Sequence, residues 1–160
     1  MIGGGDWSDD RIIPDFIKAI WQNKKFVVRS PKSTRPWQHV FDLLSGYLIL
    51  SKKLYESKKY DGSWNFGPKK KNITVKNIID GLKTELKSKK KINYKFDSFI
   101  KETNLLSLKS KKSNKILKWS PKLNIKKTIK LTGEWYYCFL TNRQNILKLS
   151  NKHVKEFFND

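Results

Sequence analysis

The sequence predicts an α/β fold within a chain of 160 residues, about one domain. Segments with apolar residues at helical spacing alternate with short, β-branched segments, which is typical of this class. A hydrophobic content of 38% with six tryptophans is enough for a modest core. The single cysteine, Cys138, excludes an internal disulfide and favours a reducing cytoplasm. No stretch approaches the roughly 20 apolar residues of a membrane span, so no membrane partner is expected.

Helical spacing of apolar residues predicts five helices, at Ile12–Trp21, Phe41–Tyr55, Ile73–Lys87, Ser113–Trp119 and Ile125–Leu140. Thr74 is a candidate N-cap for the third helix. Pro121 ends the fourth, because the residue before a proline disfavours α-helical backbone. Residues 1–140 form the main portion, and residues 141–160 are a polar C-terminal tail with the pattern of one more amphipathic helix.

Four short segments are expected to be extended. Phe26–Arg29 is β-branched, and it is a candidate to pair with Trp37–Val40 in a small ribbon. Ser63–Gly67 has the pattern of a buried strand that enters a loop, and Ile92–Phe96 alternates as a strand does.

The formal charge of +21 and the pI near 10.0 would ordinarily suggest a nucleic acid or another polyanion as partner. However, Arg11, Arg29, Arg35 and Arg143 are the only arginines among 35 basic residues, and the rest are lysines. Phosphate-gripping surfaces favour arginine forks and interleaved aromatics. Lysine runs such as Lys87–Lys91 are more typical of solvated turns. We therefore favour a solvent-exposed basic surface without a specific partner over a nucleic-acid-binding surface.

Five stretches together resemble a known family: "IGGGDW", "DRIIPD", "RSPKSTRPWQHVFDLLSGYLIL", "WNFGP" and "ILKWSPKLNIKKTIKLTGEWY". In this order they are similar to the C-terminal portion of the CDP-glucose 4,6-dehydratases, a branch of the extended short-chain dehydrogenases/reductases in the NAD-dependent epimerase/dehydratase family. The resemblance runs from Ile2 to about Tyr137. It implies the α/β substrate-binding portion of such an enzyme, without most of the Rossmann half.

The resemblance also implies an activity and a cofactor. In the family, bound NAD oxidises the sugar of a nucleotide sugar, water is lost, and a 4-keto-6-deoxy sugar nucleotide results. No G-x-G-x-x-G fingerprint follows a strand here, so we expect no NAD site and no activity in this chain alone. We assign no catalytic residue. A separately encoded Rossmann half is a conceivable partner, and the family allows a homo-oligomer.

Tyr55 and Lys59 have the Tyr-x-x-x-Lys spacing that performs proton and hydride chemistry in this superfamily. The pair of the family lies upstream of the glycine-rich segment, whereas this one follows it within a lysine-rich helix end. We interpret the spacing as a solvated lysine face.

By resemblance, Arg35 contacts the diphosphate of a CDP-glucose-like ligand, and Arg11 reaches the nucleotide at the start of the first helix. The main chain of Val28 and Arg29 would contact the pyrimidine edge, although a short strand explains the same residues. The resemblance also implies that Asp6 and Trp7 close over the sugar or base and that Glu102 lies near the nucleotide. Roles in a turn, in packing or at the surface explain these three residues equally well.

The remaining polar and aromatic residues predict structure rather than chemistry. His39 is expected to be a hydrogen-bonded structural histidine, and His153 lies far from it in the sequence. Two histidines and one cysteine, without an acidic cluster, predict no metal site. Trp119 and Trp135 are expected in the core. Lys109 replaces an acidic residue of the family pattern, which would weaken a helix cap.

Two other functions remain open from the sequence. One is a basic module for nucleic acid or another anion, which salt-dependent binding without preference for CDP-sugars would indicate. The other is a nonfunctional remnant of a truncated gene, whose exposed apolar surfaces would promote aggregation.

Overall fold

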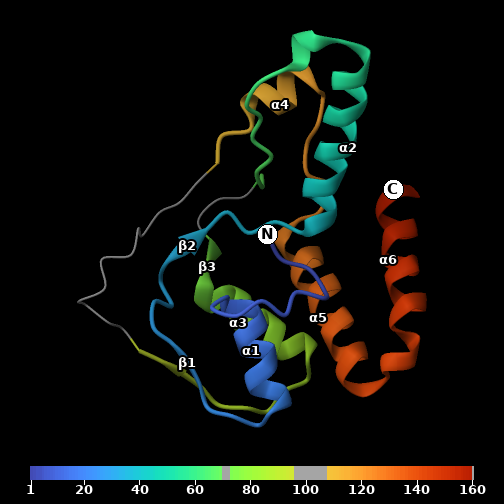
Figure 1. The fold of residues 1–160 in the computed structure, drawn as a ribbon. Coiled ribbons are helices and arrows are strands. Elements are labelled where there is room, and N and C mark those ends of the chain that lie inside the picture. The colour runs from blue at the N-terminus through green and yellow to red at the C-terminus, as the bar shows by residue number, and fades with distance from the viewer. Residues whose placement is uncertain (70–72, 96–107, 160) are drawn as a thin grey trace.

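The computed structural model describes residues 1–69, 73–95 and 108–159, and Figure 1 shows a group of helices with a few short strands at one side. The helices are α1 (Ile12–Trp21), α2 (Val40–Glu56), α3 (Val75–Glu85), α4 (Lys111–Ile116), α5 (Ile125–Thr141) and α6 (Ile146–Asn159). The strands are β1 (Phe26–Val28), β2 (Thr34–Arg35), β3 (Ile73–Thr74) and β4 (Ile92–Tyr94). Two single 3-10 turns, Lys58–Tyr60 and Arg143–Asn145, follow α2 and α5. The α/β class predicted from the sequence is confirmed.

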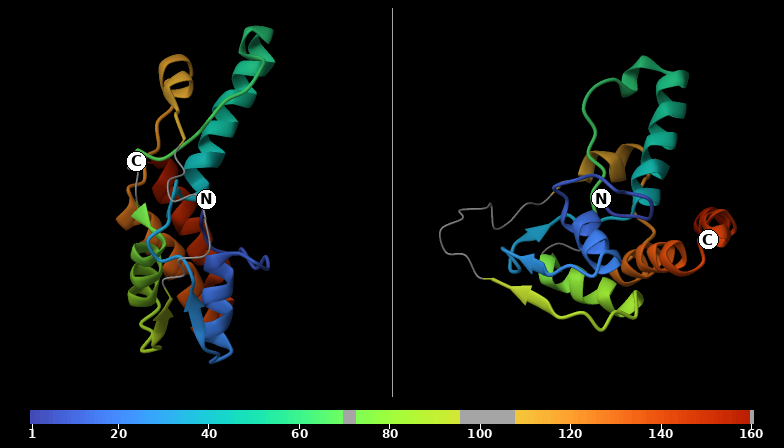
Figure 2. Two further views of the ribbon diagram at one scale, coloured as in Figure 1. Left: turned by 90° about the vertical axis from the view of Figure 1, so that its left-hand side faces the viewer. Right: turned by 60° about the horizontal axis from the view of Figure 1, so that its bottom comes forward.

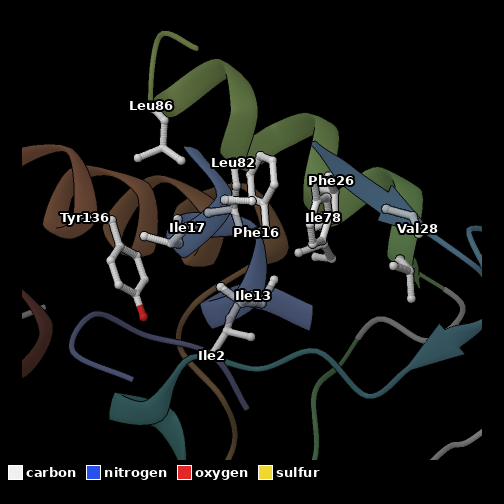
Figure 3. Close-up of a cluster of buried hydrophobic side chains, with 13 residues drawn as sticks. Ile2, Ile13, Phe16, Ile17, Phe26, Val28, Ile78, Leu82, Leu86 and Tyr136 are labelled. Atoms are coloured by element: carbon white, nitrogen blue, oxygen red, sulfur yellow. The ribbon is translucent and has the colours of Figure 1, made fainter. Parts of the chain in front are cut away.

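The main core lies where α1 meets α3 and α5 (Figure 3). Phe16 and Ile17 of α1 are fully buried, as are Ile78 and Leu82 of α3 and Tyr136 of α5. β1 closes one side of this core through Phe26 and Val28, which Figure 3 shows beside α3. Most of the apolar stripe that predicted α1 therefore faces the core, whereas Trp21 at its end is 59% exposed.

The strands pair differently from the sequence prediction. β1 runs parallel to β4, with Phe26 opposite Ile92, while β2 pairs antiparallel with β3. The predicted ribbon between Phe26–Arg29 and Trp37–Val40 is wrong, because each residue of the second segment has another partner. The Trp37 indole donates to the Ile73 carbonyl, and His39 forms a parallel bridge with Ile2 before α2 begins.

Ser63–Gly67 is not a strand either. Its backbone groups bond to side chains that flank or belong to α4: Ser113 Oγ donates to the Asn65 carbonyl at 2.5 Å, and the Gly67 amide donates to Ser110 Oγ at 2.6 Å. Side-chain partners of this kind satisfy an extended segment without a neighbouring strand. The sequence pattern of Ser63–Gly67 does not distinguish a β-strand from an extended segment that is bonded to side chains.

The helix predictions hold, with shifted ends. Thr74 caps α3 as expected and forms a capping box with Asn77, so β3 occupies the predicted first two residues of that helix. The fourth helix stops at Ile116 rather than Trp119, since Lys118 adopts a left-handed backbone with φ of 55°. The predicted strand Ile92–Phe96 extends to Tyr94, and Phe96 lies outside the described residues.

The tail helix predicted within residues 141–160 is confirmed as α6, which packs along α5. Trp135 Nε1 donates to Ser150 Oγ at 3.0 Å, and His153 lies 3.1 Å from Glu134. The C-terminal segment is therefore attached to the body of the structure.

α2 projects away from the α1, α3 and α5 group, as both views of Figure 2 show. A second, smaller cluster formed by Phe66, Leu117 and Trp119 packs against it. Trp119 is buried, as predicted, and donates to Ser45 Oγ of α2 at 3.0 Å. Trp135 is only half-buried, at the edge of the main core.

Gly46 gives a direct test of this second cluster. A Cβ at Gly46 would lie 2.4 Å from a ring carbon of Phe66, so Gly46→Ala overpacks the contact. Overpacking costs about 1–3 kcal/mol, against a gain of up to about 1 kcal/mol from helix propensity. We expect a lower free energy of unfolding, measured by urea denaturation. Ser51→Ala, on the exposed side of the same helix, should change it by less than about 0.5 kcal/mol. A Gly46 variant more stable than the parent would contradict this packing.

Candidate functional site

Two adjoining cavities lie around the N-terminal end of α1. The first, which we call the β1 cleft, has a volume of about 460 Å³ and is lined by residues that include Asp15, Val28, Arg29, Arg35, Trp37 and Val75. The second, which we call the N-terminal hollow, has a volume of about 400 Å³ and is lined by residues that include Gly3, Asp6, Arg11, Ile13 and Pro14. Ile12 and Trp37 line both cavities, so the two cavities lie side by side.

The wall of the β1 cleft between β1 and β2 is fixed by the N-terminus of α3. The amide of Val75 donates to the Ser33 carbonyl at 2.9 Å, and the amide of Lys76 donates to the Pro31 carbonyl at 3.0 Å. The Trp37 indole donates to the Ile73 carbonyl at 3.0 Å. The turn that carries the cleft residues is therefore held at three points.

Arg35 stands at the β2 side of the β1 cleft. Its side chain is half-buried, and its Nη1 donates to the Thr34 carbonyl at 2.9 Å. This bond helps to fix the direction of the planar guanidinium. Arg35 is thus positioned to offer a charged, planar donor group to the cleft.

Val28 and Arg29 also line the β1 cleft. Val28 is only 1% exposed, and its carbonyl already accepts from the Lys95 amide at 2.9 Å. Backbone groups along a strand point alternately to its two edges, so those of Val27 and Arg29 are directed away from β4. A ligand in the cleft would meet these two residues before the main chain of Val28.

In the N-terminal hollow, Arg11 and Asp6 form an ion pair at 3.2 Å, and the Arg11 side chain is 60% exposed. Asp6 also accepts from the Ser8 amide at 3.1 Å, so it caps this turn. Burial raises the pKa of Asp6, but the hydrogen bonds from Ser8 and Arg11 more than offset this effect and leave the pKa below its ordinary value. The carboxylate is therefore ionised at neutral pH and holds Arg11 beside the hollow.

The two remaining candidates from the sequence are Trp7 and Glu102. Trp7 lines neither cavity and packs against Trp21, Tyr136 and Phe139 between α1 and α5, as its packing interpretation predicts. Glu102 lies outside the described residues.

Sequence reasoning missed two acidic residues of the β1 cleft, Asp10 and Asp15. Asp15 belongs to the first turn of α1, where acidic side chains are common because they interact favourably with the helix dipole. Its position in the sequence therefore did not indicate a ligand-binding role. A signal was nonetheless present, because Asp10 and Asp15 flank Arg11, whose motif was identified.

A curated protein and several solved structures are similar to this chain. A CDP-glucose 4,6-dehydratase of Salmonella typhimurium (strain LT2) is 32% identical over 159 residues, which are 98% of this chain and 44% of that protein. Over nearly its whole length, the chain is thus similar to part of a CDP-glucose 4,6-dehydratase. No family model matches the chain. The resemblance and fold class predicted from the sequence are confirmed.

Solved structures of epimerases and dehydratases share the fold. The dTDP-glucose 4,6-dehydratase of Bacillus anthracis, in complex with NAD, superposes with a TM-score of 0.67 at 20% identity, over 91% of this chain and 44% of that one. The UDP-glucose 4-epimerase of Thermotoga maritima, with UDP-glucose, gives a TM-score of 0.66 at 19% identity, over 84% and 41%. The chain spans less than half the length of these relatives.

The glycine-rich segment does not provide the pyrophosphate site that a NAD-dependent epimerase/dehydratase needs. A Cβ at Gly4 would lie 2.0 Å from the Trp135 ring, and one at Gly3 would lie 2.7 Å from Val40 Cγ1. The space beside these glycines is filled by side chains of the chain itself. α1 also begins only at Ile12, too late for its N-terminus to follow the glycines directly. The glycine-rich segment therefore does not fit the pyrophosphate of NAD.

Tyr55 and Lys59 do not form the catalytic pair of the family. α2 ends at Glu56, and Lys59 belongs to the 3-10 turn that follows, so the two residues share no helical face. Tyr55 is 95% exposed, while the Lys59 ammonium lies 5.1 Å from the centre of the Tyr60 ring. The interpretation of this spacing as a solvated surface agrees with the structure.

His39 has the structural role predicted for it. It is buried, and its Nδ1 accepts from the Phe41 amide at 3.2 Å to cap α2. Burial, together with a smaller electrostatic effect of His153, lowers the pKa of His39 to about 4. His153, distant in sequence, thus lies near His39 in the fold.

In residues 1–69, 73–95 and 108–159, no group of three or more His, Cys, Asp and Glu side chains is arranged to hold a metal ion. No helix in the described part of the chain is long and apolar enough to cross a bilayer.

The pKa of His39 predicts how stability depends on pH. The folded-state pKa of about 4 lies below the ordinary histidine value of 6.5, so between these values the unfolded chain binds more protons. Stability contributed by neutral His39 is present above pH 6.5 and falls by up to about 3 kcal/mol as the pH drops to 4. Urea denaturation at several pH values measures this. His39→Asn keeps a capping side chain and should flatten the dependence in this window. An unchanged pH dependence in that variant would assign the effect to other groups.

Proposed function

We propose that this chain supplies the CDP-sugar-binding surface of a CDP-glucose 4,6-dehydratase-like enzyme, a lyase of nucleotide-sugar metabolism of the deoxysugar, O-antigen type. One observation carries the proposal. Three of the four arginines of the chain, Arg11, Arg29 and Arg35, line the two adjoining cavities. Among the described residues, no lysine lines either cavity, although lysines far outnumber arginines.

Arginine in these positions has a chemical reason. A guanidinium offers parallel N–H donors that hold two oxygens of a diphosphate at once, whereas an ammonium acts as a point charge. Arg35 is half-buried, so its contact is less screened by solvent than one at a surface lysine. A random scatter of basic residues in this lysine-rich chain would place lysines in the cavities as well.

In this proposal, different parts of a nucleotide sugar bind in the two cavities. Arg35 binds the diphosphate, and the extended backbone at Val27 and Arg29 lies along the base. Arg11, held by Asp6, makes a second basic contact from the hollow. The volume of the β1 cleft, about 460 Å³, lies within the range of small-molecule sites. The relative from Thermotoga maritima is described with UDP-glucose bound, which supports a ligand of this class.

The NAD-dependent steps belong to a nucleotide-binding half like that of the relatives, either in the same polypeptide or separately encoded. A surface suited to it lies on α2, where Leu44, Tyr47 and Leu48 are 45%, 50% and 61% exposed. The parallel bridge between Ile2 and His39 lies at the start of the same helix. Parallel strands are normally buried on both faces, so further structure packing against α2 is consistent with this bridge.

The contribution of Arg35 is measurable. Arg35→Ala should raise the dissociation constant for CDP-glucose by roughly 10- to 150-fold, since a charge-assisted contact is worth about 1.5–3 kcal/mol. Lys89→Ala removes the same charge from an exposed site and should change it by a few-fold at most. Calorimetric titration of the chain at two salt concentrations distinguishes these effects. Equal losses in both variants, disappearing together at high salt, would favour a nonspecific polyanion-binding surface.

The 160-residue chain by itself should not turn over CDP-glucose and should not bind NAD. The physical reason is that the glycines of its one glycine-rich segment are packed against Trp135 and Val40, and Tyr55 and Lys59 do not share a helix. Product formation is followed by the absorbance of the 4-keto sugar in alkali, and NAD binding by calorimetry. Turnover by the purified chain would show that the chemistry uses residues we have not identified.

A further inference from the structure

The β1 cleft contains acidic as well as basic groups, and the acidic ones call for an explanation. Arg29 and Arg35 lie on its β1–β2 wall, whereas Asp10 and Asp15 line it from α1 and the turn before it. Carboxylates repel a diphosphate. They are favourable in a nucleotide site only where another part of the ligand donates hydrogen bonds.

Asp15 is the better placed of the two carboxylates. It belongs to the first turn of α1, its backbone amide donates to the Arg11 carbonyl at 2.9 Å, and its side chain is half-buried. Asp10 is exposed and precedes the helix in a turn with φ of 58°. Asp15 is therefore held by regular structure at the cleft, and Asp10 is not.

The carboxylate of Asp15 lacks a close partner within the described residues. No hydrogen bond or ion pair joins it to another residue of the described ranges, and the nearby Lys18 is bonded to Asp9. Desolvation raises the pKa of Asp15, and the electrostatic effects of Asp10 and Asp9 add to this against the opposing effect of Lys18. A hydrogen-bond donor from a ligand would compensate the partial burial of this group.

The pyrimidine bases differ at the position where such a donor matters. Cytosine carries an amino group at C4, a donor, whereas uracil and thymine carry an acceptor oxygen there. Aspartate and glutamate side chains recognise cytosine through this amino group. The same carboxylate opposes uracil, because it would face the O4 oxygen with no hydrogen between them.

We propose that Asp15 determines the base specificity of the β1 cleft by accepting a hydrogen bond from the 4-amino group of cytosine, so that cytidine nucleotides bind in preference to uridine nucleotides. This inference rests on the proposed function, since it takes the cleft as the nucleotide site. The arrangement separates the two ends of the ligand: the diphosphate lies at Arg35, and the base lies between the backbone of Val27 and Arg29 and the first turn of α1.

Titration of the chain with CDP and with UDP tests the inference. The parent should bind CDP about tenfold more tightly than UDP or better, as one well-placed base contact provides. Asp15→Asn should reduce this preference to within about twofold, because the amide can offer either a donor or an acceptor. Asp10→Asn is the matched control: it removes one negative charge from the same cleft, so it should change both affinities by the same factor and leave their ratio intact.

The unmodified protein allows an independent measurement. A CDP analogue whose base lacks the 4-amino group should bind the parent about tenfold more weakly than CDP, while Asp15→Asn should bind the two alike. If the parent binds neither CDP nor UDP, the proposed function is wrong. If it binds both equally, or if Asp15→Asn binds with an undiminished preference for CDP, the proposed function stands and the role of Asp15 is refuted.

Discussion

The candidate site depends on how the N-terminus of α3 is satisfied. The first amides of a helix have no partner within it and must find acceptors elsewhere. Here the amides of Val75 and Lys76 find them in the carbonyls of Ser33 and Pro31, and the capping box of Thr74 with Asn77 satisfies the next positions. The turn between β1 and β2 is thereby attached to the start of this helix.

That attachment gives the turn the rigidity of the core. Ile78, Ile79 and Leu82 of α3 are fully buried against α1 and α5, so the helix cannot shift without opening the main cluster. Arg35 follows the attached turn directly, and β1 precedes it. A loop of this sequence without such contacts would leave the arginines mobile, and ordering them on binding would reduce the affinity.

Charge is distributed unevenly between the surface and the cleft. The chain carries a net charge of +21, yet the β1 cleft is lined by two arginines and two aspartates, Arg29, Arg35, Asp10 and Asp15. The surface lysines act over a distance and are screened by salt. Groups inside a cleft act at contact distance and discriminate by geometry, so a high net charge and selective binding of a small anion are compatible here.

The helices could be predicted from the sequence because their apolar periodicity is local, and Thr74 followed from capping chemistry. The strand pairing could not be predicted, because β1 pairs with β4 across more than sixty residues of sequence. The sequence of Phe26–Val28 does not by itself specify which strand it pairs with. Arg35 and Arg11 were identified through family motifs, while Asp15 was missed, since a first-turn carboxylate has an ordinary explanation in the helix dipole. Only the fold shows that it lines the same cleft as Arg35.

The central claim is that a cytidine diphosphate ligand occupies the β1 cleft, and mapping backbone amide shifts by NMR during titration with CDP tests it most directly. We predict saturable shifts concentrated at residues 26–30 and 35–37 and in the first turn of α1, persisting at high salt. Shifts spread over the lysine-rich surfaces, such as residues 87–91 and α6, and lost on adding salt would contradict the assignment of the site.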